Sequence, residues 1–229
     1  MRVLVAGHNG KMGQVAVKAL DNAGHTVIGI GSGDSLINTI KDQKPDVMID
    51  LTTPDQVKIH TQHAIEHKLP IVVGTTGLTH KDIDELSNLA NQYQTGVIIA
   101  PNFSLGALLM MHCAQIAEHF YDDIDIVEVH HPQKKDQPSG TALRTAVMLN
   151  KPAKIHSRRQ KGILADQTIH FGGEGEILSI KHHTTDRNCF MAGMLFAVKK
   201  VVNLNQLVYG LDQLLFPKGV TLPEDVFNN

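Results

Sequence analysis

Histidines and lysines gather in one short stretch of the sequence, just before a turn that opens an apolar helix. The stretch is Glu128-Val-His-His-Pro-Gln-Lys-Lys-Asp-Gln-Pro-Ser-Gly-Thr-Ala142. Histidine exchanges protons near neutral pH, and lysine carries a compact positive charge. The start of a helix presents free backbone N–H groups and the positive end of a dipole, so it attracts anions. The pattern predicts a site that binds a small carboxylate and supplies a proton to it.

Five positions in this stretch are candidates for separate roles. His130 directly ends an apolar run, so a sheet should fix its orientation, and Lys134 follows four residues later across a turn. At the helix start, Ser139, Gly140 and Thr141 would offer hydroxyl and N–H groups to a carboxylate. The alternative is a solvated polar loop followed by an ordinary helix with a Ser or Thr cap.

A second informative stretch lies near the N-terminus, where an apolar run meets three glycines. Gly7, Gly10 and Gly13 follow a strand pattern and precede a helical one, which is the context of a dinucleotide-binding turn. Gly7 would permit the tight turn, Gly10 the approach of a pyrophosphate, and Gly13 close packing of helix on strand. Asn9 stands where the usual motif has its second glycine, so a glycine turn without a ligand is the alternative.

An acidic residue about 20 positions beyond such a turn binds a ribose hydroxyl in NAD-dependent proteins. Asp34 lies 21 residues after Gly13, next to Gly33 in a loop that ends the second apolar run. No Arg or Lys lies near this loop to meet a 2′-phosphate, which favours NADH over NADPH, although Ser32 and the backbone could serve that phosphate. The alternative is an ordinary turn aspartate.

Short apolar runs alternate with helical patterns through the first hundred residues. The runs are apolar along their whole length, as in strands that are covered on both faces. We therefore predict an α/β fold with a Rossmann-like, doubly wound parallel sheet. Ligands of such sheets bind at the carboxyl ends of the strands. Polar or glycine-rich loops follow the runs at 7–13, 31–34, 52–54, 74–77 and 100–104.

Two of these loops are candidates for the nicotinamide end of the cofactor. Gly74-Thr-Thr-Gly77 and Ala100-Pro-Asn-Phe-Ser104 follow the fourth and fifth runs. Their backbone groups would hold the carboxamide, and Phe103 would wall the ring. The alternatives are loop glycines and a core phenylalanine.

The pattern changes after residue 103, where we predict a second α+β domain over 104–188 with an open mixed or antiparallel sheet. The first domain is expected to consist of residues 1–103 together with residues 189–229, which return to it. The elements expected here are helices over 105–120, 141–149, 190–202 and 206–216, and strands over 125–130, 165–171 and 175–183.

Composition excludes several classes of protein. The 229 residues are 42% hydrophobic and 19% charged, which is ordinary for a globular chain with a buried core. A net charge of −2 provides no field to hold nucleic acid or an anionic membrane. No stretch approaches the ~20 apolar residues of a membrane span, and no signal-peptide pattern is present. Cys113 and Cys189 lie outside metal or redox spacings, which fits reduced thiols and a cytoplasmic location.

Other histidines are interpreted more simply. His60, His63 and His67 share one face of an expected helix at spacings that would suit zinc, but no cysteine or carboxylate completes a ligand set. We expect that face to be exposed and to hold no metal. His182-His183 are interpreted as a polar strand end, and Arg187 is a candidate partner for a carboxylate.

Four motifs together resemble the 4-hydroxy-tetrahydrodipicolinate reductase (dihydrodipicolinate reductase) family of lysine and diaminopimelate synthesis. They are Gly-x-x-Gly-x-Met-Gly at 7–13, Gly-Thr-Thr-Gly at 74–77, Ala-Pro-Asn-Phe-Ser at 100–104, and the His-His-x-x-Lys stretch at 128–142. They occur in the family's order, and the last is highly specific. The chain departs from the family in being short between its second expected strand and Asp46, which leaves the cofactor-discriminating residues only loosely aligned at Gly33 and Asp34.

The resemblance implies roles for particular residues. His130 would be the catalytic acid and Lys134 a second proton-donating residue, and His131, Gly140 and Thr141 would contact the substrate. Asp34 would lie near the adenosine ribose. The other implied cofactor contacts are Gly7, His8, Asn9, Gly10, Lys11, Met12, Gly74, Thr75, Thr76, Ala100, Pro101, Asn102 and Phe103.

The resemblance also implies a reaction. NADH or NADPH would deliver a hydride to C4 of the unsaturated ring left when water departs from 4-hydroxy-tetrahydrodipicolinate, and His130 would protonate C3. Such enzymes are usually homotetramers built through the sheet of the second domain. Two alternatives stay open: a different amino-acid or imine dehydrogenase on the same plan, and a non-catalytic module that binds a nucleotide without consuming it.

Overall fold

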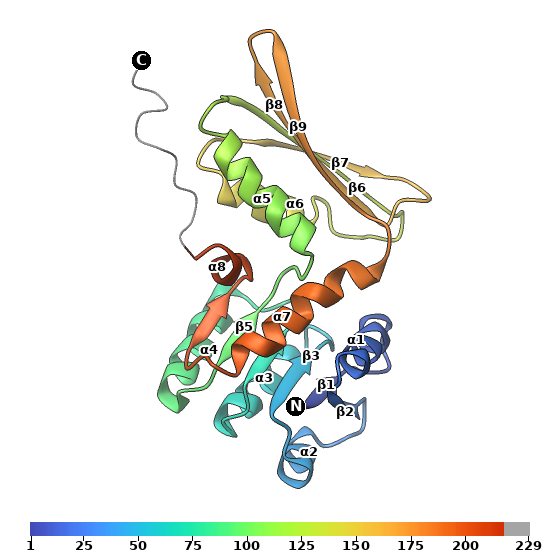
Figure 1. Cartoon of the computed structure of the whole chain (residues 1–229), viewed down its shortest axis with the longest axis vertical. Helices are drawn as coiled ribbons and strands as arrows, with labels where there is room; N and C mark the ends of the chain where they lie inside the picture. Colours follow the sequence, from blue (N-terminus) through green and yellow to red (C-terminus); the bar gives the residue numbers. More distant parts are fainter. Residues whose placement is uncertain (218–229) are drawn as a thin grey trace. The chain divides into compact units, whose positions relative to one another are not determined.

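The computed structural model describes residues 1–217, which form two compact units (Figure 1). Unit 1 contains residues 1–103 and 190–211, and unit 2 contains residues 104–189 and the described residues from Asp212 onward. Of the residues 189–229 that were expected to return to the first domain, 190–211 lie in unit 1, and Cys189 and 212–217 lie in unit 2. Residues 218–229 lie outside the described part of the chain.

Unit 1 is built on a six-stranded sheet with the strand order β10-β5-β4-β3-β1-β2, and all its strand pairs are parallel. The strands are Arg2–Ala6 (β1), Thr26–Ile30 (β2), Val47–Asp50 (β3), Ile71–Val73 (β4), Val97–Ile99 (β5) and Leu207–Tyr209 (β10). The helices are Lys11–Asn22 (α1), Leu36–Gln43 (α2), Val57–Glu66 (α3), His80–Tyr93 (α4) and Met191–Val201 (α7). The predicted doubly wound parallel sheet is confirmed.

Local sequence explains several of these elements. Every residue of β3, β4 and β5 is buried, as expected for strands covered on both faces. Thr79 caps α4. Its hydroxyl accepts from the Asp82 N–H at 3.2 Å, and the Asp82 carboxylate accepts from the Thr79 N–H at 2.9 Å. This reciprocal capping satisfies two N–H groups that the helix cannot pair internally.

The prediction of one helix over 206–216 is wrong. Leu207–Tyr209 form the edge strand β10, and the helix α8 covers only Asp212–Leu215. Val208 is buried in register with a residue of β5, and Gly210 turns the chain with φ of 93°. A three-residue apolar run has too little periodicity to separate strand from helix, so the open edge of the sheet decides its conformation.

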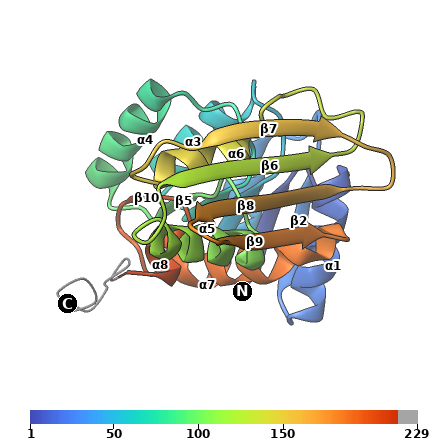
Figure 2. The same ribbon diagram turned by 90° about the horizontal axis from the view of Figure 1, so that it is seen from above.

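Unit 2 contains a four-stranded sheet with the order β7-β6-β8-β9, whose strands lie side by side in Figure 2. The strands are Asp123–His130 (β6), Lys154–Arg159 (β7), Ala165–Gly173 (β8) and Glu176–Thr184 (β9). The helices are Leu105–Ala117 (α5), Gly140–Met148 (α6) and the short 3₁₀ helix Arg187–Phe190 (η1). Strand β6 pairs parallel with β7 and antiparallel with β8, and β9 is antiparallel to β8, so the sheet is mixed, within the predicted class.

Strand β7 was not expected from the sequence. Its residues alternate between exposed and half-buried, but Lys154, His156 and Arg158 on one side and Ser157 and Arg159 on the other leave only one aliphatic side chain in the strand. Hydrophobic alternation is therefore nearly absent, although the strand lies at the edge of the sheet, where charged side chains are common.

Alternation along β6 determines which side chains face the helices of unit 2. Ile124 and Ile126 are buried in a core with Ala114 of α5 and Ala142 of α6. Successive strand residues point to opposite faces, so Glu128 and His130 continue the side occupied by the two isoleucines. A carboxylate and an imidazole thus extend the hydrophobic core of unit 2 at the end of β6.

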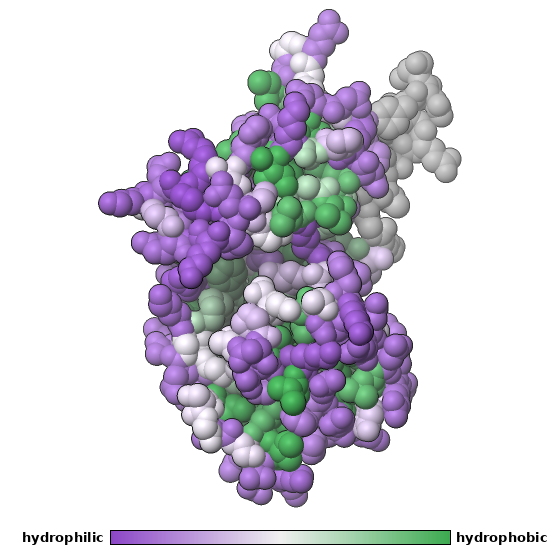
Figure 3. Space-filling view, turned by 180° about the vertical axis from the view of Figure 1, so that it is seen from behind, coloured by the Kyte–Doolittle hydropathy of each residue, from purple (hydrophilic) through white to green (hydrophobic). Residues whose placement is uncertain are grey.

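The surface seen in Figure 3 is mostly polar, with patches of apolar side chains on both units. Exposed large apolar side chains of unit 2 include Leu143, Val147 and Ile177. Within residues 1–217, no helix has both the length and the apolar character needed to cross a bilayer.

Candidate active site and nucleotide pocket

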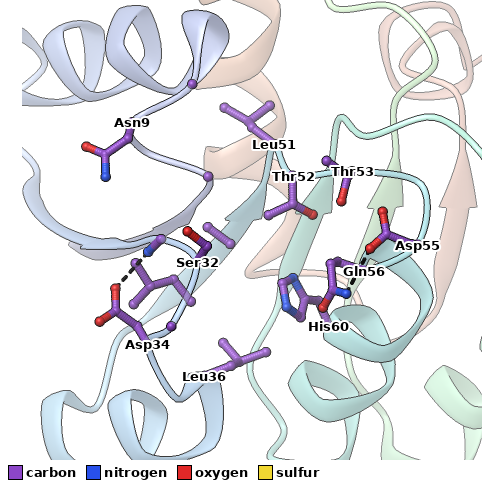
Figure 4. A pocket seen from close by; sticks show the side chains of 16 residues that line it. Asn9, Ser32, Asp34, Leu36, Leu51, Thr52, Thr53, Asp55, Gln56 and His60 are labelled. Atoms are coloured by element: carbon purple, nitrogen blue, oxygen red, sulfur yellow. Dashed lines mark hydrogen bonds between the residues drawn. The ribbon is translucent and has the colours of Figure 1, made fainter.

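A pocket of about 640 Å³ opens in unit 1 at the carboxyl ends of β1, β2 and β3 (Figure 4). Five predicted cofactor residues line it: Gly7, Asn9, Gly10, Gly33 and Asp34. Figure 4 shows Ser32 and Asp34 on one side and Thr52, Gln56 and His60 on the other. Thr52 and Thr53 belong to the loop 52–54 that was expected at this edge. The sequence did not identify the rest of that wall: Leu51, Asp55, Gln56 and His60.

Close backbone approach explains the glycines of the first turn. Gly7 has φ of +82°, and a Cβ there would lie 2.4 Å from the Leu51 carbonyl oxygen. A Cβ on Gly13 would lie 2.1 Å from the Gly7 carbonyl oxygen, so α1 packs directly on the turn. Gly10 precedes α1, whose first turn carries no acidic side chain. The N–H groups of this helix start are therefore available to an anion.

Other residues of the predicted cofactor set lie near this turn. Lys11 is exposed and Met12 is half-buried at the start of α1. The His8 ring lies against β2, because a Cβ on Gly29 would be 2.7 Å from it. These positions surround the glycine turn without lining the pocket itself.

Asp34 closes the loop that follows β2. Its Oδ2 atom accepts from the Gly31 N–H at 2.8 Å, which places Ser32 and Gly33 in an exposed turn between them. The structure therefore gives this carboxylate the role of a turn aspartate, while its side chain also lines the pocket. Because this hydrogen bond orders the loop, the Asp34 carboxylate has a defined position at the pocket.

The predicted nicotinamide loops line a second, smaller cavity of unit 1. Thr75, Thr76, Ala100 and Pro101 lie on its wall. Phe103 behaves as a core residue: it is 5% exposed, and its ring would be 2.6 Å from a Cβ on residue 74, which is glycine. Asn102 is half-buried in the same loop.

A buried carboxylate that the sequence did not single out joins three segments beside the pocket. Asp50 ends β3, is 0% exposed, and its Oδ2 lies 2.7 Å from His60 Nδ1. Its Oδ1 accepts from the Thr75 hydroxyl at 2.6 Å, the Thr52 hydroxyl at 2.8 Å and the Thr52 N–H at 3.1 Å. Burial alone would raise the pKa of Asp50, but these hydrogen bonds, the one with His60 first, outweigh it and lower that pKa.

The expectation of an exposed histidine face on α3 is wrong for His60, whose side chain is only 17% exposed. The three rings also have different partners. His63 Nδ1 lies 3.5 Å from a Glu66 carboxylate oxygen, and His67 Nδ1 lies 2.8 Å from the His63 carbonyl oxygen. Among residues 1–217, no group of three or more His, Cys, Asp or Glu side chains is arranged to hold a metal.

Unit 2 contains the predicted acid, His130, at the end of β6. Its Nδ1 atom makes a short hydrogen bond with Oε2 of Glu128, which is 0% exposed. Arg159 Nη1 lies 3.1 and 3.2 Å from the two Glu128 oxygens. Burial lowers the pKa of His130, and the adjacent Glu128 carboxylate offsets only part of that effect. The imidazole can therefore lose its proton more readily than a solvated one.

Lys134 lies in the turn that follows His130. Its N–H donates to the His131 carbonyl at 3.1 Å, and its ammonium pairs with Asp136 at 2.8 Å. The hydrogen bond from Lys134 is the largest cause of the lowered pKa of Asp136. His131 is half-buried, with its Nδ1 atom 3.1 Å from Gln133 Oε1. A bound carboxylate would compete with Asp136 for the same ammonium.

The start of α6 divides the predicted carboxylate contacts into two kinds. Ser139 is 1% exposed, and its hydroxyl accepts from the Ala142 N–H at 3.2 Å. It is thus the ordinary helix cap that was the alternative interpretation. Gly140 is exposed and Thr141 is half-buried, and a hydrogen bond from the Gly140 backbone helps to lower the pKa of Asp136. The start of α6 therefore already lies close to a carboxylate of this chain.

The remaining polar candidates of unit 2 lie in β9 and in the short helix that follows it. His182 Nε2 lies 3.1 Å from the Ser104 hydroxyl, and His183 pairs with Asp166 at 3.0 Å. Arg187 is half-buried in η1. The first histidine supports the start of α5, and the second belongs to a surface ion pair. Cys113 and Cys189 are both free thiols.

Models of one protein family match almost the whole chain. The model of the N-terminus of dihydrodipicolinate reductase matches residues 1–103, and the model of its C-terminus matches residues 106–215. The chain belongs to the dihydrodipicolinate reductase family. The resemblance found in the sequence motifs is thereby confirmed.

Relatives of this dihydrodipicolinate reductase family member cover it nearly end to end. The 4-hydroxy-tetrahydrodipicolinate reductase of Legionella pneumophila (strain Philadelphia 1) is 44% identical over 93% of this chain and 99% of its own. The enzyme of the same name from Bacillus licheniformis is 38% identical over 94% of this chain and 98% of its own. A dipicolinate-bound dihydrodipicolinate reductase from Paenisporosarcina sp. TG-14 is 34% identical with a TM-score of 0.80, and the match covers 93% of this chain and 99% of that one.

More distant structures share only the fold with this reductase. An amine dehydrogenase from Mycobacterium smegmatis has a TM-score of 0.67 at 10% identity. The match covers 88% of this chain and 92% of that one. Such folds host many reactions, so the chemistry must be argued from the side chains.

Proposed function

We propose that the chain reduces 4-hydroxy-tetrahydrodipicolinate to tetrahydrodipicolinate, with His130 as the proton donor. Family membership makes the chain an oxidoreductase of lysine and diaminopimelate biosynthesis that acts with a pyridine nucleotide. The observation that carries the proposed roles is the hydrogen-bonded His130, next to a lysine and the start of α6. An acid near neutral pH beside a carboxylate site is what reduction of an unsaturated ring dicarboxylate requires.

The pocket of unit 1 fits a dinucleotide. Side chains at Gly7 and Gly13 would meet backbone atoms, and the start of α1 offers N–H groups to a pyrophosphate. Asp34 would bind an adenosine ribose hydroxyl, with Gly33 beside it. Since the loop Gly31–Ser35 carries no Arg or Lys, NADH is the preferred cofactor. Reduced nicotinamide supplies the hydride when it is bound.

The residues of unit 2 supply the rest of the chemistry. His130 donates its Nδ1 hydrogen to Glu128, which leaves Nε2 to protonate C3 of the ring. The Lys134 ammonium and the N–H groups of Gly140 and Thr141 bind carboxylate oxygens and counter the charge that develops. A relative described as dipicolinate-bound supports a planar dicarboxylate as the ligand.

A coupled assay tests this function. Dihydrodipicolinate synthase makes the unstable substrate in situ, and NADH absorbance is followed after the reductase is added. We expect NADH consumption that requires both proteins, and slower consumption at equal NADPH concentration. Consumption with other keto or imino acids but not with this substrate would indicate a different dehydrogenase, and NADH binding without consumption would indicate a sensing module.

Two further expectations follow from family membership and are proposals for this chain. One is a homotetramer assembled through the sheet of unit 2, measured by light scattering with native mass spectrometry. The other is a cytoplasmic location, which the two free thiols support.

A further inference from the structure

We propose that Glu128 and Arg159 form a positioning pair that holds both proposed proton-donating residues, His130 and Lys134, in their working geometry. The inference rests on the proposed function of that site. Neither residue carries a predicted role from the sequence, and neither needs to touch the substrate. Their effect would pass through the imidazole and through the backbone of the loop that carries the lysine.

Strand register places the pair next to the acid. In the β6–β7 pairing, Glu128 lies opposite Ser157, and His130 lies opposite Arg159. Glu128 faces the core side of the sheet and is fully buried, so its charge needs close partners. Its charged or chargeable partners are the His130 imidazole and the Arg159 guanidinium, and the Ser157 hydroxyl also helps to lower its pKa. Edge strand β7 thus brings a cation opposite His130, from where its guanidinium reaches the Glu128 carboxylate.

Arg159 also holds the loop between β6 and α6. Its Nη2 atom donates to the Asp136 carbonyl at 2.6 Å, and its Nε atom donates to the Lys134 carbonyl at 3.3 Å. The adjacent N–H of Gln160 donates to the His130 carbonyl at 2.9 Å. One guanidinium therefore connects the carboxylate that orients the imidazole with the backbone that carries the lysine. A planar five-donor group can do this, whereas an ammonium cannot.

This arrangement determines which of its two ring protons His130 donates, namely the one on Nε2. In the charged imidazole, Nδ1–H donates to Glu128 and Nε2–H is the acidic group. When the Nε2 proton moves to the ring carbon, a neutral imidazole remains that still donates through Nδ1, and Glu128 stays ionised. Because Arg159 shares the Glu128 charge, the carboxylate orients the imidazole without binding its second proton too strongly. Solvent then returns a proton to Nε2.

The charges that act on His130 within the described chain come from three places. They are Glu128 on its own strand, Arg159 on β7 and Lys134 in the following loop. On β8 its register partner is the uncharged Ala165. The carboxylate favours the charged imidazole, and the two cations oppose it. Removing the carboxylate should therefore shift the titration of His130 in one predictable direction.

Three variants separate charge from geometry: Glu128→Gln, Arg159→Lys and Arg159→Gln. Arg158→Gln is the matched control, since its side chain is exposed on the opposite side of the same strand. The titration of His130 is measured by NMR in the protein without substrate, and kcat is measured against pH with the coupled assay. Nucleotide affinity and the unfolding midpoint are measured for every variant.

For Glu128→Gln we expect the pKa of His130 to fall by about one unit or more, since an opposite charge at contact is lost. The alkaline limb of the kcat profile should move down with it, and kcat should fall on the order of 10- to 100-fold. Arg159→Lys should keep the titration of His130 near that of the parent while lowering kcat, because charge remains and the loop contacts do not. Arg159→Gln should lower kcat further, and Arg158→Gln should match the parent.

Three results would overturn the proposal, two of them direct. One is an unchanged His130 titration in folded Glu128→Gln, and the other is parental kcat in Arg159→Lys and Arg159→Gln together. A general loss of stability with an unshifted pH profile would indicate a merely structural pair, and would also overturn it. If the parent protein consumes no NADH with the dicarboxylate, the proposed function fails, whereas the NMR titration still tests the Glu128–His130 coupling.

Discussion

In each unit of the described chain, a carboxylate with no exposed surface binds a histidine through Nδ1. Asp50 pairs with His60 in unit 1, and Glu128 pairs with His130 in unit 2. Both carboxylates are 0% exposed, and hydrogen bonds lower the pKa of both below the ordinary value. The two pairs therefore begin from the same chemistry and differ in what surrounds them.

The difference lies in the second partner of each carboxylate. Asp50 is completed by neutral donors, namely the hydroxyls of Thr52 and Thr75 and one backbone N–H. Glu128 also has a cation among its partners: besides the Ser157 hydroxyl, which helps to lower its pKa, it contacts the guanidinium of Arg159 at 3.1 and 3.2 Å. Asp50 joins β3, the start of α3 and the loop after β4 through hydrogen bonds, and we call this cluster the clamp. A carboxylate shared with a cation orients the histidine and still lets it give up a proton.

The largest expected effect separates the two histidines by function. His130→Gln should lower kcat on the order of 10²- to 10⁴-fold, since a general acid is lost, and should leave the dissociation constant of NADH unchanged. His60→Gln should show the opposite pattern, with weaker NADH binding and kcat retained at saturating NADH. The measurements are steady-state kinetics in the coupled assay and fluorescence titration with NADH.

The comparison fails if both variants lose kcat to a similar extent at saturating NADH. His60 would then affect the reacting atoms, and the Asp50 pair would no longer be a clamp. Near-normal turnover of His130→Gln would reject the acid itself and would return the assignment to Lys134.

The second prediction concerns stability. Asp50→Ala should reduce the free energy of unfolding by about 2–4 kcal/mol, because it leaves the donors of His60, Thr52 and Thr75 without their acceptor in a buried place. Urea unfolding of the parent and the variant gives the difference, with equal m-values as the check that the same transition is compared. Asp55→Ala is the matched control, since Asp55 is exposed at the pocket rim. A loss of the same size in both variants would contradict the clamp.

The contrast between the two units also shows what the sequence can predict. The steric needs of Gly7 and Gly13 are local, so spacing alone indicates the turn, and His130 ends a strand in a stretch whose composition is unusual. The parallel sheet follows from apolar runs that need no partner information. These features depend on residues within a few positions of one another.

The missed features depend on distant partners. Arg159 lies 31 residues from the carboxylate it meets, on a strand whose polar sequence does not predict a strand. Thr75 lies 25 residues from Asp50, and a terminal acid on an apolar run was the only local signal of that cluster. Strand β10 similarly forms because the sheet has an open edge next to β5. Register and edge position belong to the folded chain, so periodicity could not give them.

The third prediction uses acid to weaken the clamp. The folded-state pKa of Asp50 is lowered relative to an unfolded aspartate, which titrates near ~3.9. A carboxyl with a depressed pKa contributes stability above its unfolded pKa and loses that contribution as pH falls through its folded pKa. The stability difference between the parent and Asp50→Asn should therefore be constant near neutral pH and should shrink below about pH 4.

Urea unfolding at a series of pH values measures this difference. Glu128→Gln provides the second curve of the comparison, since the pKa of Glu128 is also lowered and its difference should shrink in the same direction. A difference in unfolding free energy between parent and variant that grows on acidification would contradict this. It would mean that burial dominates and that the pKa of Asp50 is raised instead of lowered.

The smallest expected effect comes from removing one hydrogen bond of the Asp50 cluster, the one from Thr75. Thr75→Val keeps the shape of the side chain and removes the hydroxyl that lies 2.6 Å from Asp50 Oδ1, so the unfolding free energy should fall by about 1 kcal/mol. Thr76→Val is the matched control, because Thr76 is the exposed neighbour in the same loop. Both threonines are proposed nicotinamide contacts and Thr75 is also bonded to Asp50, so Thr75→Val should weaken NADH binding more than Thr76→Val does. Equal binding by the two valine variants would separate the Asp50 cluster from the cofactor, and its role would then be confined to the folding of unit 1.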